Sequence, residues 1–230
     1  RLARATVLMG VPTFYTRLLA SPRLTKEAVS GTRLFISGSA PLLAQTHAEF
    51  EARTGQRILE RYGMTETGMS ASNPLVGERR AGTVGMALPG VELRVCDAGG
   101  APAPAGEVGV LEVRGPNVFK GYWRMPEKSA AETRADGFFV TGDLATIGAD
   151  GYVTIVGRAK DLVISGGLNI YPKEVEEALD ALPGVIESAV VGAPHPDLGE
   201  AVVAVLTVSA DPGDVPAALR ARLSGFKLPR

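Results

Sequence analysis

The feature that most constrains the fold is a change in hydrophobic pattern, which occurs twice along the 230-residue chain. Residues 6–60 alternate short apolar strands with helices, a pattern typical of a parallel sheet. Residues 83–156 carry short strands of alternating polarity separated by turn residues, which indicates antiparallel hairpins. Residues 162–223 then mix strands and helices in the order βαββα. The sequence therefore predicts an α/β protein with a parallel-sheet part, an antiparallel β subdomain and a small α+β domain at its C-terminal end.

The switch back to mixed strands and helices also predicts the domain boundary. We place it so that residues 1–157 belong to a large domain and residues 158–230 to a small one. About seventy residues lie beyond that boundary, which is within the size range of a small independent domain.

Composition excludes several classes of protein. The formal charge is -1 and the pI is near 6.2, so the chain lacks the basic excess of a nucleic-acid-binding protein. Hydrophobic residues make up 45% and charged residues 21%, which excludes a disordered chain. The longest apolar stretch, Ala201–Leu206, is far shorter than the ~18 residues of a membrane helix, so no membrane span is predicted.

Cysteine and histidine give little indication of chemistry. The single cysteine, Cys96, fits a reducing compartment, and a cytoplasmic location is the default expectation. Because one cysteine and two histidines lie far apart in sequence, no zinc pattern is present. We expect His47 to be an ordinary surface or half-buried histidine.

The strongest local motif is Tyr62-Gly63-Met64-Thr65-Glu66, which we place directly after the third predicted strand. Ligands gather at the carboxyl ends of parallel strands. A ring can stack on a base, a hydroxyl can contact phosphate, and a carboxylate can hold Mg²⁺. The alternative is an ordinary loop in which Thr65 and Glu66 begin the next helix as a cap.

Four short signatures occur in one order along the chain, and together they resemble the adenylate-forming superfamily. The superfamily includes acyl-CoA synthetases and the adenylation domains of peptide synthetases. The resemblance implies its fold, a large AMP-binding domain followed by a small mobile C-terminal domain. The signatures are Gly38-Ser39-Ala40-Pro41, Tyr62-Gly63-Met64-Thr65-Glu66, Thr141-Gly142-Asp143 and Gly157-Arg158-Ala159-Lys160-Asp161.

The resemblance also implies roles for individual residues. Thr65 and Glu66 are the expected catalytic residues, with Thr65 contacting phosphate and Glu66 holding Mg²⁺. Tyr62 is expected to stack on adenine, while Asp143 and Arg158 bind the ribose hydroxyls. The nucleotide-binding set is Gly38, Ser39, Ala40, Pro41, Tyr62, Gly63, Met64, Asp143 and Arg158.

Further along the chain, Lys160 resembles the superfamily's hinge residue. Gly166 and Gly167 resemble the loop that approaches the pantetheine arm of coenzyme A. The alternatives are that Asp143 is a turn residue and that Arg158 and Lys160 are solvated charges near the boundary.

Two motifs of the superfamily are not found in this sequence. These are the Ser/Thr/Gly-rich phosphate loop, expected upstream, and the C-terminal segment with the catalytic lysine. Lys227 lies before Pro229 rather than in that lysine's context. We therefore expect the chain to be an internal fragment of a longer enzyme, with little activity alone.

The expected reaction is that of an acyl-CoA synthetase. A small carboxylic acid reacts with ATP to give an acyl-adenylate and pyrophosphate, and the thiol of coenzyme A then displaces AMP. The rivals are a peptide-synthetase adenylation domain, a fatty or aryl acyl-CoA synthetase, and a folded but inactive fragment that only binds nucleotide. The oligomeric state stays open.

The expected acid is malonate, with methylmalonate as a second substrate. Residues 10–19 and 60–67 resemble the malonyl-CoA synthetase branch of the superfamily. Arg61 places a large cation before the Tyr-Gly pair, where it can meet a second carboxylate with two parallel hydrogen bonds. Arg17 is the other candidate partner, and Met64 is expected beside the substrate's α-carbon. Alternatively, either arginine extends to solvent or pairs with Glu60.

Overall fold

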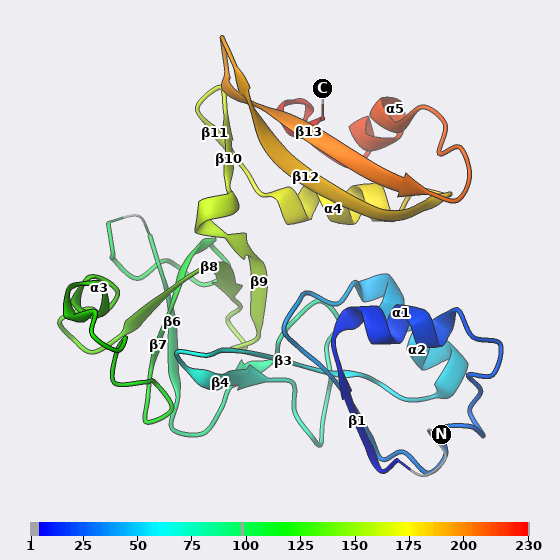
Figure 1. Cartoon of the computed structure of the whole chain (residues 1–230), viewed down its shortest axis with the longest axis horizontal. Coiled ribbons are helices and arrows are strands. Elements are labelled where there is room, and N and C mark those ends of the chain that lie inside the picture. Colours follow the sequence, from blue (N-terminus) through cyan, green and yellow to red (C-terminus); the bar gives the residue numbers. More distant parts are fainter. Residues whose placement is uncertain (1–4, 98, 230) are drawn as a thin grey trace. The chain divides into compact units, whose positions relative to one another are not determined.

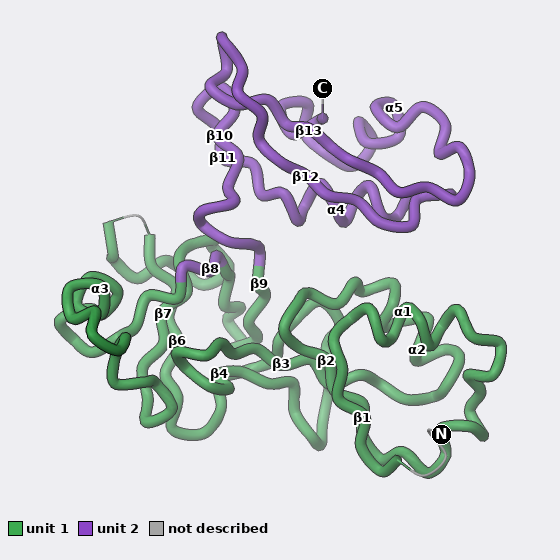
Figure 2. Tube along the Cα trace, in the orientation of Figure 1, with its two compact units in different colours: residues 1–141, 145–155 green, residues 142–144, 156–230 purple. Residues whose placement is uncertain are grey.

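The computed structural model describes residues 5–97 and 99–229. These residues form two compact units, which Figure 2 distinguishes by colour. The first unit contains the described residues up to Thr141 together with Ala145–Ile155, and the second contains Gly142–Leu144 and the residues from Val156 onward. The predicted domain boundary after residue 157 falls close to this division.

A five-stranded mixed sheet forms the beginning of the first unit (Figure 1). The first three strands are parallel, as the alternation of strands and helices predicts, and the last two continue the sheet antiparallel. Helices α1 (Pro12–Leu19) and α2 (Ala44–Thr54) connect the parallel strands. In sheet order the strands are β1 (Val7–Gly10), β2 (Leu34–Ser37), β3 (Leu59–Met64), β4 (Gly68–Ser72) and β5 (Met86–Ala87).

Both helices pack against the same face of this sheet through aromatic side chains. The ring of Phe50 on α2 makes edge contacts with Tyr15 on α1 and Phe35 on β2, at centroid distances of 5.4 and 5.0 Å. All three side chains are fully buried, so this cluster fixes the helices over the strands. The α2 helix ends at Gly55, whose left-handed φ of 71° is one that glycine adopts without strain.

Arg53, in the last turn of α2, anchors the segment that follows α1. Its guanidinium donates hydrogen bonds to the backbone carbonyls of Leu24, Leu19 and Ser21 at 2.8, 2.5 and 2.5 Å. A lysine ammonium lacks the planar fork that reaches three carbonyls at once.

We expect Arg53→Lys to lower the free energy of unfolding of the chain by about 1–2 kcal/mol, because at least one carbonyl loses its charged donor. Arg57→Lys is the matched control. Its exposed guanidinium pairs with Glu51 at 2.7 Å, and exposed ion pairs contribute little. Urea denaturation followed by circular dichroism measures the stability of both variants. Equal denaturation midpoints for the two variants would contradict the anchoring role of Arg53.

The antiparallel sheet of the first unit contains a charged cluster around Glu112. Glu112 is completely buried and accepts hydrogen bonds from Arg94 and Arg134 at 2.8 and 2.7 Å. Both carboxylate oxygens are therefore satisfied, as a buried charge requires. The sheet has the order β6 (Glu92–Cys96), β7 (Gly109–Arg114), β8 (Phe139–Ile147) and β9 (Val153–Arg158), and the short helix α3 (Pro126–Ala131) lies between β7 and β8 in sequence.

The second unit is an α+β module, and it contains one more strand than predicted. Strand β11 pairs with β10 in a short hairpin, so the order is ββαββα rather than βαββα. Val175 and Leu179 on α4 and Leu219 on α5 are buried in its core. Its elements are η2 (Ala159–Asp161), β10 (Val163–Ser165), β11 (Leu168–Ile170), α4 (Pro172–Asp180), β12 (Val185–His195), β13 (Gly199–Val208), α5 (Val215–Arg220) and η3 (Gly225–Lys227).

The predicted α/β fold class is confirmed. No helix in residues 5–97 and 99–229 is long and apolar enough to cross a membrane.

Candidate functional site

The predicted ligand motif lies within a strand and the turn that follows it. Strand β3 extends to Met64, so the prediction that Tyr62, Gly63 and Met64 follow the strand is wrong. The reason is pairing, because β3 runs antiparallel to β4 over these residues. The alternative that Thr65 and Glu66 begin a helix is also wrong, since the chain turns directly from β3 into β4. The turn leaves Thr65 exposed and Glu66 half-buried.

Gly63 makes this arrangement possible. The register of β3 against β4 shifts between Tyr62 and Gly63, which marks a β-bulge. A Cβ atom at Gly63 would overlap the backbone carbonyl of Gly68 on the facing strand. The close approach therefore requires glycine, and it positions the turn that carries Thr65 and Glu66.

Tyr62 is partly buried against the core of the antiparallel sheet. It packs beside a cluster that includes Val95, Leu111 and Val153. Its expected role in stacking on adenine stays a prediction.

The loop after β2 carries the Gly38-Ser39-Ala40-Pro41 signature. Ser39 has a φ of 68°, a left-handed conformation that costs a residue with a side chain about 1 kcal/mol or more. A Cβ atom at Gly38 would lie 3.3 Å from the carbonyl oxygen of Arg61 and 3.5 Å from its Cγ. Gly38 thus leaves room for the Arg61 side chain to pass beside β2. Strain of this kind is often found at ligand sites.

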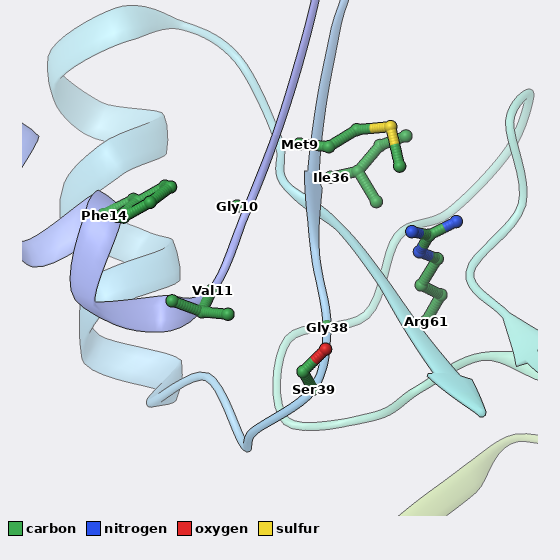
Figure 3. A pocket seen from close by; sticks show the side chains of 8 residues that line it. All are labelled: Met9, Gly10, Val11, Phe14, Ile36, Gly38, Ser39 and Arg61. Atoms are coloured by element: carbon green, nitrogen blue, oxygen red, sulfur yellow. The ribbon is translucent and has the colours of Figure 1, made fainter. Parts of the chain in front are cut away.

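A pocket of about 250 Å³ lies at the carboxyl ends of the first strands (Figure 3). Figure 3 shows the Arg61 side chain extending from β3 toward Ile36 and Met9. The lining residues are Met9, Gly10, Val11, Phe14, Ile36, Gly38, Ser39 and Arg61.

The guanidinium of Arg61 is the chemically distinctive group in this pocket. Within the described part of the chain it makes no hydrogen bond and no ion pair, and its residue is only partly exposed. The alternative pairing with Glu60 does not occur, because neighbouring residues of a strand point to opposite faces. Glu60 instead lies beside His47 of α2, with Oε1 and Nδ1 3.6 Å apart. His47 is only 3% exposed, so the expectation of a surface or half-buried histidine is wrong.

The pocket contains only some of the residues predicted for it. Arg17 is exposed on α1 and does not line the pocket, and neither does Met64. Ala40 and Pro41 are exposed outside it as well. The apolar lining residues Met9, Val11, Phe14 and Ile36 were missed by the sequence analysis. The rule that ligands bind at the carboxyl ends of parallel strands would have identified Val11, which follows β1 directly, and Phe14, which lies in the first turn of α1.

Glu66 is held by a residue from another part of the chain. The Tyr122 hydroxyl lies 3.1 Å from Oε1 of Glu66 and 2.7 Å from Oε2 of Glu132. Burial and these two contacts raise the pKa of the Tyr122 phenol, so it stays protonated at neutral pH.

Glu66 offers one carboxylate to the kind of Mg²⁺ site that binds with phosphates, and its role as a metal ligand stays a prediction. Such sites use one or two carboxylates, and substrate phosphate and water complete the coordination. Among the described residues there is no group of three or more potential metal-binding side chains.

In the second unit, the structure brings Asp143 and Arg158 together. Nε of Arg158 lies 2.7 Å from Oδ1 of Asp143, whose side chain is 6% exposed. Asp143 lies inside β8, so the alternative of a turn residue is wrong. Arg158 ends β9 and is not merely a solvated charge. A paired acceptor and donor fork suits vicinal hydroxyl groups, and the ribose role stays a prediction.

The remaining predicted residues also lie in the second unit. Lys160 is exposed in η2. Gly166 and Gly167 form the exposed turn between β10 and β11, with φ values of 58° and 79°. Two successive left-handed residues are typical of a tight hairpin turn. The structure tests neither the hinge role nor the coenzyme A role.

Comparison with known proteins identifies the family. The sequence profile of the AMP-binding enzyme family matches residues 2–123, and the profile of its C-terminal domain matches residues 174–230. The chain belongs to the AMP-binding enzyme family. The predicted membership of the adenylate-forming superfamily is therefore confirmed.

Three known proteins illustrate the similarity. The structure of ATP-bound MatB from Rhodopseudomonas palustris is 60% identical with a TM-score of 0.95, and covers 100% of this chain and 46% of MatB. A malonyl-CoA ligase in a ternary product complex with methylmalonyl-CoA and AMP is 47% identical, with a TM-score of 0.62. The match covers 98% of this chain and 50% of the ligase. Feruloyl-CoA synthase of Amycolatopsis sp is 42% identical over 236 residues. This match covers 99% of this chain and 47% of the synthase. The chain thus spans about half the length of these relatives.

Proposed function

We propose that this chain is part of an ATP-dependent acyl-CoA synthetase that converts malonate, and also methylmalonate, to the coenzyme A thioester. The observation that carries the proposal is the guanidinium of Arg61, which has no partner among the described residues and lies in a small pocket with apolar walls. A pocket of about 250 Å³ is smaller than the ~300–1,000 Å³ of pockets that enclose drug-sized ligands. Its size and the Arg61 guanidinium among its described lining residues therefore favour a short acid with a second negative charge.

Arg61 recognises the second carboxylate in this proposal. A carboxylate removed from water needs a partner, and a guanidinium meets it with two parallel hydrogen bonds. Holding that end of the acid orients the other carboxylate for attack on the α-phosphate of ATP. A malonyl-CoA ligase with methylmalonyl-CoA and AMP bound is 47% identical to this chain, which supports malonate and methylmalonate as the proposed acids.

The turn after β3 serves the nucleotide in the proposal. The Thr65 hydroxyl would donate a hydrogen bond to a phosphate oxygen, and Glu66 would hold Mg²⁺. When bound, Mg²⁺ would offset phosphate charge and so allow an anionic acid to approach. Tyr62, Asp143 and Arg158 bind the adenosine part. Coenzyme A is the second substrate, and Gly166 with Gly167 forms the loop that its pantetheine arm approaches.

A panel of acids tests this proposal in the full-length enzyme that we expect to contain this chain. The rate of AMP formation with malonate, methylmalonate, acetate, octanoate and ferulate is measured with coenzyme A present. Malonate should give the highest kcat/KM. Because feruloyl-CoA synthase is 42% identical, an aryl acid is the second candidate, and preference for ferulate or octanoate would overturn the dicarboxylate assignment.

We also propose that residues 158–230 form the small domain and that Lys160 acts as its hinge between the two half-reactions. Proline is tolerated in the first turn of a helix but fixes φ. Lys160→Pro in η2 should therefore leave adenylate formation nearly unchanged and slow thioester formation by about tenfold, because the hinge must change φ and ψ. Pyrophosphate exchange and single-turnover thioester formation separate the two steps. Equal losses in both would contradict the hinge.

A further inference from the structure

Residues 117–122, which we call the clamp segment, hold the turn between β3 and β4 from outside the five-stranded sheet. The backbone N–H of Phe119 donates to the carbonyl of Glu66 at 2.7 Å. The side-chain amide of Asn117 donates to the carbonyls of Thr67 and Met69 at 2.6 and 3.3 Å. The clamp segment therefore binds the backbone at Glu66 and directly after it.

The last residue of the clamp segment, Tyr122, reaches the Glu66 side chain itself. Its hydroxyl oxygen lies 3.1 Å from Oε1 of Glu66 and 2.7 Å from Oε2 of Glu132, which follows α3. A phenol carries one proton, so it donates to one carboxylate at a time. The hydroxyl is within hydrogen-bond distance of both carboxylates, so Glu66 and Glu132 share it as a donor.

The position of the Tyr122 hydroxyl is fixed by contacts on every part of the residue. The ring packs edge-on against Phe119 at a centroid distance of 4.9 Å, and the Lys128 ammonium lies 4.0 Å from the ring centroid. The Tyr122 backbone N–H donates to the Ser129 hydroxyl at 2.8 Å. A side chain held in this way can act as a rigid support for a flexible glutamate.

We propose that Tyr122, itself held by Glu132, is a positioning residue that orients the Glu66 carboxylate toward the divalent cation. This inference rests on the proposed function. Within the described residues, Oε2 of Glu66 makes no hydrogen bond or ion pair, so it is the oxygen available to the cation. Mg²⁺ demands near-ideal geometry, and partners that orient a metal-binding side chain typically change metal affinity by about 10–100-fold.

The direct test is the affinity for Mn²⁺, used in place of Mg²⁺ because its paramagnetism reports binding. Mn²⁺ is titrated into the full-length enzyme saturated with a non-hydrolysable ATP analogue. We expect Tyr122→Phe to weaken Mn²⁺ binding by about 10–100-fold. The affinity for the same analogue in EDTA, without metal, should stay within about twofold of wild type, because the adenosine contacts do not involve Tyr122.

Tyr152→Phe is the matched control. It also removes one phenol hydroxyl in the same unit, which donates to the backbone carbonyl of Glu78 at 2.8 Å, and it should not change Mn²⁺ affinity. Glu132→Ala should change the Mn²⁺ affinity in the wild-type background, because it removes one of the two acceptors of the Tyr122 hydroxyl, and it should have no further effect in the Tyr122→Phe background.

The outcomes separate this inference from the proposed function. Unchanged Mn²⁺ affinity in Tyr122→Phe, or an equal loss of analogue affinity in EDTA, overturns the positioning role and leaves the proposed function in place. Additive effects of Tyr122→Phe and Glu132→Ala on Mn²⁺ affinity would show that Glu132 does not act through the phenol. Such a result overturns the claim that Glu132 holds Tyr122 in place. Failure of the wild-type enzyme to bind Mn²⁺ and the analogue together overturns the proposed function and this inference with it.

Discussion

Replacing Arg61 by alanine in the full-length enzyme should lower kcat/KM for malonate by about 100-fold, which corresponds to about 2.7 kcal/mol. The reason is that the second carboxylate of the acid would enter the pocket without a charged partner. Truncating one member of a hydrogen-bonded charge pair typically costs about 2–5 kcal/mol. The measurement is the kcat/KM for malonate relative to that for acetate, since acetate has no second carboxylate and its rate reports whether the variant is folded.

Two further arginine variants sharpen this experiment. Arg61→Lys keeps the charge but loses the planar fork, and should give a kcat/KM for malonate between those of wild type and Arg61→Ala. Arg17→Ala tests the rival candidate. Because Arg17 is exposed on α1 and does not line the pocket, this variant should retain the wild-type preference for malonate. A loss of that preference in Arg17→Ala, with none in Arg61→Ala, would transfer the role to Arg17.

Local sequence pattern predicted the parallel part of the fold well, because each strand there carries its own apolar run. Strands β1 and β2 lie within the predicted alternation of strands and helices, whereas β3 continues to Met64, beyond the end that the pattern indicates. Elements that depend on a partner strand were missed. Strand β4, with the sequence Gly-Met-Ser-Ala-Ser, has little apolar alternation and forms because it pairs with the extended end of β3. Helix α3 has no buried residue, so it produces no hydrophobic periodicity.

In the candidate site, too, the sequence indicated features that are local and missed features that depend on contacts between distant residues. Residue type and motif order indicated Arg61, Glu66 and Asp143, since their charges suit particular parts of the substrates. Sequence could not indicate that Tyr122 contacts Glu66, because 56 residues separate them and only the packing of the clamp segment on the turn joins them. The bulge at Gly63 was likewise invisible, because it depends on the facing carbonyl of Gly68.

That bulge gives the second large expected effect. Gly63→Ala should reduce adenylate formation in the full-length enzyme by about 100-fold, since a misplacement of about 1 Å in groups that position a substrate can cost that much. The added Cβ would overlap the Gly68 carbonyl, which is backbone and cannot rotate away as a side chain does. Strand β4 must therefore move from β3, and the turn that carries Thr65 and Glu66 must move with it.

A series of glycine variants separates this cause from a general effect of adding a methyl group. At Gly225 nothing lies within 4 Å of an added Cβ, and Gly225→Ala should behave as wild type. At Gly38 the Cβ would lie 3.3 Å from the carbonyl oxygen of Arg61, so Gly38→Ala should have an intermediate effect, mainly on malonate rather than on ATP. Pyrophosphate exchange measures adenylate formation, and thermal unfolding measures stability. Wild-type exchange by Gly63→Ala would show that the β3–β4 turn does not position the reacting groups, because the overlap with Gly68 forces that turn to move.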